Sequence, residues 1–153
     1  MEPHDDPDIK NCDYLIRRIS KVHHIVRDEN FNCYRISTKA FQVSSGTSAG
    51  MSVDILRLIE EADENPREFV LDSLGSGAVM FEAQIPRSRG LRVGKEPLEA
   101  NPYHGEVWPI ESRPRFTKSE RRFLLEHSKW FVEIEAVRLH VGSPIVQTQT
   151  QPK

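Results

Sequence analysis

The sequence has little of what marks the most specialised protein classes. Its 153 residues include two cysteines, Cys12 and Cys33, which are too few for a disulfide framework and are not paired closely enough for a thiolate metal site. No apolar run approaches the length of a membrane span, and the polar, acidic start does not resemble a secretory signal. We therefore expect a cytoplasmic protein with reduced thiols and no membrane partner.

The chain also lacks a strong excess of charge. Its net charge of -2 provides no global field that would attract a polyanion, which disfavours a nucleic-acid partner. Charge is nevertheless uneven along the chain, because basic residues gather at 87–95 and 113–122 whereas acidic residues gather before residue 14 and at 54–72. This pattern fits two solvated faces of opposite sign, or a binding patch.

Several catalytic signatures are absent. The small-residue stretch 43–50 lacks the Gly-Lys-Ser/Thr ending of a phosphate-binding loop, and the chain contains no Gly-x-Ser-x-Gly nucleophile elbow. The His-x-Glu at positions 104–106 lacks the paired cysteines of zinc deaminases, and no other residue has diagnostic ligand spacing, so we expect no metal site. The sequence identifies no cofactor.

What is present suits one small folded domain. Apolar residues make up 37% and charged residues 29% of the chain, and the apolar ones fall into short periodic stretches. Residues 1–11 and 147–153 lack such periodicity, so we expect a flexible N-terminal segment, a single globular domain over 12–146 and a flexible C-terminal tail. We also expect a mobile loop at 43–50.

Strands and helices both have clear signals. Strict alternation predicts strands at 77–85, 104–108, 130–134 and 137–141, with shorter extended pieces at 15–19, 24–26 and 91–93. Helical spacing predicts a helix from Val53 to Ala62, Asn65-Pro66 begins a second short helix, and the capping box Thr117-Lys-Ser-Glu120 begins a third. Ser52 or Asp54 would then be the N-cap of the first helix. The fold predicted is α+β, a single domain with a small mixed or antiparallel sheet and two or three helices.

The most suggestive segment is Asn101-Pro-Tyr-His-Gly-Glu-Val-Trp108. A strand here would place His104, Glu106 and Trp108 on one face, with an imidazole beside a carboxylate as general acid–base catalysis requires. The alternative is a turn in which Asn101 caps a bend, His104 bonds a backbone carbonyl and Glu106 faces water. Under the catalytic interpretation, Asn101 and Tyr103 are candidate ligand-binding residues.

A second segment, 34–54, contains the remaining candidates. Arg35, Ser37, Ser52 and Asp54 could bind a phosphate or carboxylate, because arginine offers a two-pronged donor and hydroxyls add further donors. Alternatively, Arg35 pairs with an acid to hold the loop. The catalytic hypothesis requires that Arg35 and His104 share one solvent-reachable hollow.

The order of these motifs resembles that of small uncharacterised bacterial proteins. The resemblance rests on Arg17-Arg-Ile19, Ser37-x-x-Ala-Phe41, Met51-Ser-Val-Asp54 and Asn101-Pro-Tyr-His104, within about residues 15–135. It implies a bacterial cytosolic origin and no known activity. The order Arg35, Ser52, Glu106 is also similar to ADP-ribosyltransferase-type toxins, which handle NAD with an arginine, a serine and a glutamate, although spacing and flanking residues depart from that pattern.

Two functions follow. The first is a non-catalytic protein-interaction module of a multi-gene bacterial system, which binds a protein partner and needs no special residue. The second is a small enzyme acting on a nucleotide-like or phosphorylated ligand, in which Arg35 binds the anion and His104 with Glu106 transfers a proton.

Overall fold

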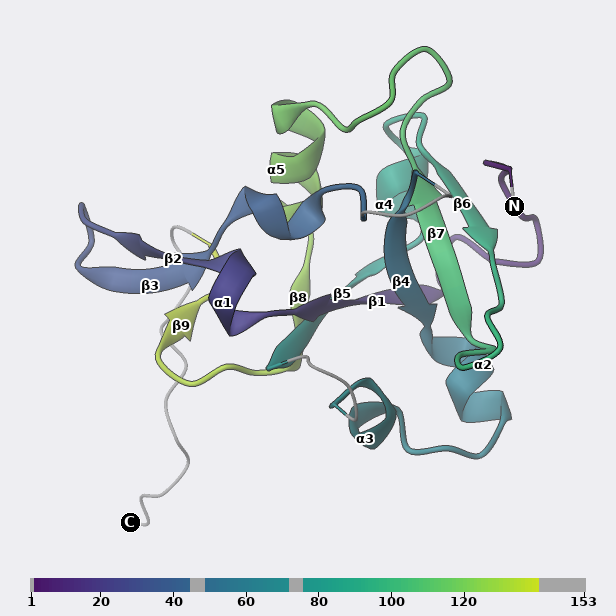
Figure 1. The fold of residues 1–153 in the computed structure, drawn as a ribbon, viewed down its shortest axis with the longest axis horizontal. Coiled ribbons are helices and arrows are strands. Elements are labelled where there is room, and N and C mark those ends of the chain that lie inside the picture. The colour runs from purple at the N-terminus through teal and green to yellow at the C-terminus, as the bar shows by residue number, and fades with distance from the viewer. Residues whose placement is uncertain (1, 45–48, 72–75, 141–153) are drawn as a thin grey trace.

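The computed structural model describes residues 2–44, 49–71 and 76–140. The predicted tail at 147–153 and residues 45–48 of the predicted mobile loop lie outside these residues. Within the described part, the chain is one α+β domain with nine strands, which confirms the predicted fold class (Figure 1).

A six-stranded antiparallel sheet forms the centre of the molecule, in the order β6-β7-β4-β1-β5-β8 (Figure 1). Its strands in chain order are β1 (Tyr14–Ile19), β4 (Met51–Ile55), β5 (Gly77–Glu82), β6 (Arg92–Lys95), β7 (His104–Trp108) and β8 (Lys129–Val132). The smaller, mixed sheet has the order β2-β3-β9, with β2 (Ile25–Asp28), β3 (Cys33–Ile36) and β9 (Val137–Arg138). β2 and β3 form an antiparallel hairpin, and β9 joins β3 in parallel.

The helices are short. They are α1 (Lys21–His24), α2 (Leu56–Glu61), α3 (Pro66–Leu71), α4 (Gln84–Arg87), α5 (Lys118–Glu126) and one 3-10 helix, η1 (Thr38–Phe41). The Thr117 capping box at the start of α5 is present with both of its hydrogen bonds, as predicted. α1 and α4 are additional single turns, so the described residues contain more helices than the two or three expected.

The central sheet is buried on both faces. On β1, Leu15 and Ile19 belong to the larger core cluster, which includes Phe41 and Leu124 from η1 and α5. The next residue along, Ile16, faces the other side, where a smaller cluster includes buried residues of α2 and α3. The alternation along β1 therefore places one apolar layer on each side of the sheet.

Two element boundaries differ from expectation. The helix predicted from Val53 begins at Leu56, because residues 51–55 pair with β7 along their length and also join β1. Ser52 and Asp54 are therefore strand residues, and the helix cap is Ile55 without a side-chain cap bond. The strand predicted at 77–85 ends at Glu82, where α4 follows.

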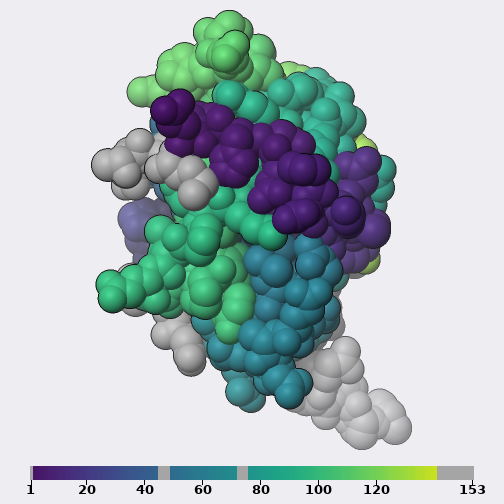
Figure 2. Space-filling view, turned by 90° about the vertical axis from the view of Figure 1, so that its right-hand side faces the viewer, coloured from purple at the N-terminus to yellow at the C-terminus, as the bar shows by residue number. Residues whose placement is uncertain are grey.

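The N-terminal segment, residues 2–13, packs against the rest of the domain. Figure 2 shows it in dark purple across one face of the molecule. Ile9 is only 1% exposed, and the backbone N–H of Asp6 donates to the carbonyl of Val93 in β6 at 2.8 Å. One buried isoleucine and many polar contacts place residues 2–11 against the domain despite their lack of apolar periodicity, and the flexibility expected for 1–11 stays a prediction.

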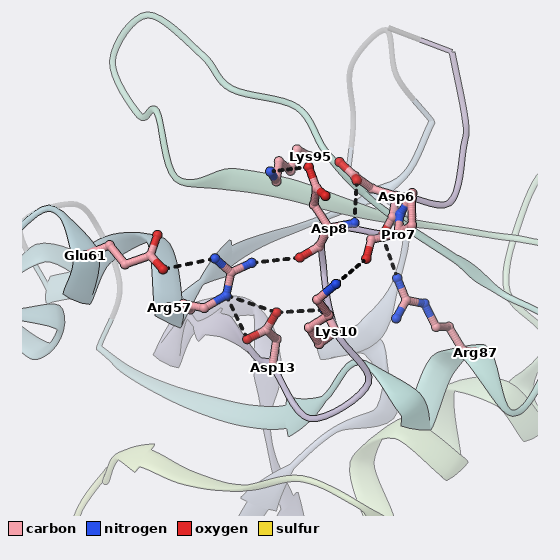
Figure 3. Close-up of polar contacts among 9 residues, drawn as sticks. All are labelled: Asp6, Pro7, Asp8, Lys10, Asp13, Arg57, Glu61, Arg87 and Lys95. Atoms are coloured by element: carbon pink, nitrogen blue, oxygen red, sulfur yellow. Dashed lines mark hydrogen bonds and ion pairs between the residues drawn. The ribbon is translucent and has the colours of Figure 1, made fainter.

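Arg57 in α2 makes several of these contacts (Figure 3). Its Nε donates to both carboxylate oxygens of Asp13, at 3.1 and 3.2 Å, and its Nη2 donates to the carbonyl of Asp8 at 2.8 Å. Arg87 in α4 contacts the segment nearer to its N-terminus, where its Nη2 donates to the carbonyl of Asp6 at 2.9 Å. Two arginines from separate helices therefore fasten the segment.

Candidate functional site

The pairing of β4 with β7 assembles a row of polar side chains. The register sets Asp54 opposite His104 and Ser52 opposite Glu106, and residues directly opposite each other share a face of the sheet. The predicted alignment of His104 with Glu106 is confirmed, since Nε2 of the imidazole lies 3.2 Å from Oε2 of the carboxylate. Both strands are interior strands of the sheet, and Asp54, His104 and Glu106 are buried whereas Ser52 is partly buried.

His104 is held from both ends of its ring. Its Nδ1 lies 2.7 Å from the carbonyl oxygen of Glu96, so this nitrogen must carry the hydrogen. Nε2 faces the Glu106 carboxylate, an acceptor, and this contact is favourable when Nε2 is protonated as well. Burial by itself lowers the pKa of His104, but the bonds to Glu106 and to the Glu96 carbonyl outweigh it, so the pKa is raised above its ordinary value. The arrangement therefore favours an imidazolium beside a carboxylate.

Ser52 extends this pair toward solvent. Its hydroxyl lies 3.4 Å from Oε2 of Glu106 and 3.3 Å from the hydroxyl of Ser44. The same Glu106 oxygen thus contacts the Ser52 hydroxyl and the His104 ring. Ser52, Glu106 and His104 are thus joined in one continuous chain of polar contacts.

Arg17 fills a gap in the sheet. β1 and β4 pair only at Leu15–Ile55 and Ile16–Asp54. Beyond that point the Arg17 side chain supplies hydrogen bonds to the backbone. Its Nε donates to the carbonyl of Ala40 at 2.8 Å, and its Nη1 donates to the carbonyl of Ser52 at 2.9 Å. Burial lowers the pKa of Arg17 to about 10, against the opposing pull of the nearby carboxylates.

Arg18, Asp54 and Asn101 form a second polar group. Nε of Arg18 lies 2.9 Å from Oδ2 of Asp54, and the Asn101 amide donates to the other oxygen of that carboxylate at 2.7 Å. Asp54 is only 3% exposed, so both donors are needed to compensate a buried charge. The contact also fixes the loop before β7 against β4.

These groups border a hollow of about 230 Å³, which we call the central hollow. Its lining comprises Arg17, Arg18, Ser52, Val53, Asp54, Leu98, Asn101 and His104. Four of the six residues that the sequence suggested for catalysis or ligand binding in segments 52–54 and 101–106 therefore line one opening, and Glu106 lies directly behind it. The Arg18 guanidinium is paired with Asp54, so the Arg17 guanidinium, the Ser52 hydroxyl and the His104 imidazole, whose pKa is raised, suit a small polar ligand with a negatively charged group.

Three predicted residues lie elsewhere. Arg35 and Ser37 line a different hollow, beside α5, and Arg35 pairs with Asp28 at 2.9 Å. The expectation that Arg35 and His104 share one hollow is therefore wrong, because β3 belongs to the smaller sheet. For the same reason Arg35 does not join Ser52 and Glu106 in the arrangement suggested by the toxin resemblance. Tyr103 is buried in the smaller core cluster and donates its hydroxyl to Glu64 at 2.7 Å.

Sequence reasoning missed Arg17, Arg18 and Glu96 as site residues. A signal existed for Arg17, which stands at a core-facing position between Leu15 and Ile19 in a buried strand. A charged side chain in such a position needs internal partners and therefore indicates a built polar site. Glu96 had no local signal, because its approach to His104 depends on the turn that joins β6 to β7.

Three side chains could offer ligands to a metal ion. Glu96, His104 and Glu106 each place one ligand atom within 4.8 Å of the others. Against a cation stand the guanidinium of Arg17, which interacts electrostatically with Glu106, and the proton that the Nε2–Glu106 contact favours. We therefore interpret this cluster as a proton site, and the absence of a metal stays a prediction.

In comparisons with protein-family models, with curated proteins and with solved structures, no match to this chain was found. No helix among the described residues has both the length and the apolar character needed to cross a lipid bilayer. The interpretation of the central hollow therefore rests on its own residues.

Proposed function

We propose that the protein is a small enzyme that binds a small anionic molecule in the central hollow and transfers a proton on it. The observation that carries this proposal is the contact chain Ser52–Glu106–His104, with 3.4 Å and 3.2 Å between its members, which begins at the wall of the hollow. A hydroxyl backed by a carboxylate, which in turn is paired with an imidazolium, is a route for a proton into and out of the site.

Arg17 is the residue that would bind the anionic group of the ligand. Arg17 uses Nε and Nη1 on backbone carbonyls, and its Nη2 has no hydrogen-bond partner among the described residues. A carboxylate or phosphoryl oxygen in the hollow would accept from Nη2. The volume of about 230 Å³ favours a compact substrate over a whole nucleotide.

The roles follow from geometry. Glu106 acts as the base that accepts the proton of Ser52 or of a substrate group in its place, and His104 stabilises the Glu106 carboxylate before the transfer. His104 is therefore a positioning residue, because both of its ring nitrogens already have partners within the fold.

The test begins with binding. Small carboxylates and phosphate monoesters are screened by thermal shift, since a ligand of the native state at about 100 times its Kd stabilises it by about 2.7 kcal/mol. Hits are then incubated with the protein and followed by NMR for conversion. We expect Ser52→Ala and Glu106→Gln to bind the hit but to lose conversion by at least about 100-fold. Arg121→Gln, on a residue that lines neither the central hollow nor the hollow with Arg35, serves as the control and should convert at the wild-type rate. Binding without any conversion by the wild-type protein would refute the catalytic role.

A second function is favoured by a different feature. Val22 on α1 is 81% exposed, and Phe31 and Tyr34 on the β2–β3 hairpin are 53% and 48% exposed. Figure 1 shows this hairpin extending away from the central sheet. The surface supports the interaction module inferred from the sequence. Phe31→Asp with Tyr34→Asp should abolish association with a protein partner encoded beside this chain, measured by sedimentation, and leave the central hollow unaltered.

A bacterial, cytoplasmic origin belongs to this proposal too. The cytoplasmic part is supported by Cys12 and Cys33, both free thiols as expected in a reducing compartment, and the bacterial part rests on the order of the sequence motifs alone. Localisation of the tagged protein by cell fractionation tests this, and recovery from an oxidising compartment would contradict it.

A further inference from the structure

The second hollow lies beside α5 and is independent of the proposed proton transfer. It has a volume of about 440 Å³ and is bordered by the end of β3, the start of η1 and one face of α5. Three cationic side chains line it, Arg35 from β3 and Lys118 and Arg122 from α5. The hydroxyl-bearing residues Ser37 and Thr38 complete the side opposite the helix. We call it the α5 hollow.

The α5 hollow is lined by three cationic side chains and by one carboxylate, that of Glu126. Lys118 and Arg122 are four residues apart on α5 and so share one face of the helix, where like charges repel each other. Within the described part of the chain, neither side chain forms an ion pair or a hydrogen bond. Glu126 also lines the hollow, yet it makes no ion pair with Arg122 among the described residues. Only Arg35 is neutralised, by Asp28 at 2.9 Å.

This concentration of charge opposes the balance of the whole chain, which is -2. A cluster of like charges in a concave surface raises the local concentration of counter-ions. An anion bound there would relieve the repulsion between Lys118 and Arg122. The cluster therefore points to a negatively charged ligand that the chain itself does not supply.

Phosphate is the anion that matches these donors. A guanidinium binds two phosphate oxygens at once, an ammonium binds as a point charge, and hydroxyls add neutral donors. The hollow is larger than a phosphate group, and Leu125 contributes an apolar wall for an organic part. We propose that the α5 hollow binds the phosphate group of a small phosphate monoester. Arg35 and Ser37, which the sequence suggested as anion-binding residues, would act here.

A surface for nucleic acid would behave differently. Arg115 and Arg121 line a neighbouring hollow, together with Ser44 and Phe116. A polyanion that lay across both hollows would contact these arginines as well as Lys118 and Arg122. A small phosphate monoester in the α5 hollow would not. Arg121→Gln therefore removes the same charge from the same helix outside the proposed site.

The experiment is a titration of the isotopically labelled full chain with phenyl phosphate, followed by backbone amide NMR. We expect saturable shifts at Ser37, Thr38 and residues 118–122, and at least a tenfold weaker Kd for Lys118→Gln and for Arg122→Gln. Arg121→Gln should change the Kd by less than twofold. Both target side chains are exposed, and unchanged amide spectra outside the hollow would confirm that the variants are folded.

Three results would overturn the proposal. Absence of saturation with phenyl phosphate at millimolar concentration is the first. Equal weakening by Arg121→Gln is the second, because it would show a general attraction of anions to this surface. The third is a single-stranded oligonucleotide that binds more tightly than phenyl phosphate and loses affinity in all three variants, which would identify a nucleic-acid surface.

Discussion

The Nη1 atom of Arg17 donates a hydrogen bond to the carbonyl oxygen of Ser52 at 2.9 Å, just beyond the point where β1 and β4 stop pairing. The side chain thus replaces contacts that a neighbouring strand would make, and it does so at the wall of the central hollow. Stability and ligand binding are expected to depend on the same guanidinium.

Replacing Arg17 by methionine tests this dependence. The variant keeps the apolar stem but leaves the carbonyls of Ala40 and Ser52 without their donor, and each unsatisfied acceptor costs about 1–3 kcal/mol. We expect the free energy of unfolding in urea to fall by about 2–4 kcal/mol. Arg121 is half-buried and lies outside the central hollow, and Arg121→Gln should change the free energy of unfolding by less than about 0.5 kcal/mol. A loss no larger than that of the control would show that water replaces the guanidinium.

The stability of the protein should decline as the pH rises through the pKa of His104. Because Glu106 and the Glu96 carbonyl raise that pKa in the folded state, the native protein holds this proton more tightly than the unfolded chain does. The contribution is complete below the ordinary value of 6.5 and is lost above the raised value. Urea unfolding at a series of pH values should show a flatter alkaline limb for His104→Gln. The exposed His127 provides the control, since His127→Gln should keep the wild-type slope.

His24 should have the opposite effect. Burial, and then the positive charge of Arg17, lower its pKa to about 4, and its Nδ1 accepts the backbone N–H of Ser20 at 3.0 Å. The unfolded chain therefore binds the proton first, so stability is complete above the ordinary value of 6.5 and is lost as the pH falls toward about 4. His24→Asn should weaken this acid sensitivity in thermal melts. The exposed His127, which is not among the groups that lower the pKa of His24, is the control. Equal melting temperatures for His24→Asn and wild type at every acidic pH, after correction for the offset at neutral pH, would contradict the assignment.

Gly50 and Gly94 offer a matched pair of substitutions. A Cβ at Gly50 would lie 2.4 Å from Oε1 of Glu106 and 2.9 Å from the ring of Trp108, both buried. A Cβ at Gly94 would lie 2.5 Å from the ring of His4, which belongs to the N-terminal segment and can move aside. We expect Gly50→Ala to destabilise by about 1–3 kcal/mol and Gly94→Ala by less than half as much, measured by urea unfolding. Equal losses would indicate that the N-terminal segment is as firmly held as the core.

Arg57 should control the attachment of the N-terminal segment. Arg57→Gln leaves the carboxylate of Asp13, which is 8% exposed, without its ion-pair partner, so we expect a loss of about 1–3 kcal/mol and faster tryptic cleavage after Lys10. Lys95→Gln removes a 3.5 Å contact to an exposed aspartate, Asp8, and should cost less than about 0.5 kcal/mol. Unchanged cleavage in Arg57→Gln would assign the attachment to Ile9 instead.

Local patterns in the sequence predicted the local features of the structure. The alternation at His104 and Glu106 identified both the strand and the contact between the two side chains, because residues two apart in a strand share a face. The capping box identified the start of α5, because the hydrogen bonds between Thr117 and Glu120 join residues only three apart in the chain. Residues 53–55 of β4 were predicted as helix because the strand runs directly into α2, and Ile55 continues the helical spacing of Leu56 and Ile59.

Long-range pairing could not be read in the same way. Arg17 reaches the site because β1 joins the sheet between β4 and β5, and Glu96 because β6 is the neighbour of β7. Arg35 was placed wrongly because nothing in its own segment shows that β3 pairs with β2 and β9 instead of the central sheet. The identity of the site residues depended on strand order, which one sequence does not contain.

The hydrogen bond from Asp6 to Val93 has one more consequence. β6 is the outermost strand of the central sheet, and an outer strand presents backbone groups to which another chain can add. The N-terminal segment occupies part of that boundary and shields it from a second copy. Proteolytic loss of the first eight residues would therefore expose the edge of β6. Two molecules could then pair through this strand, and the protein would aggregate.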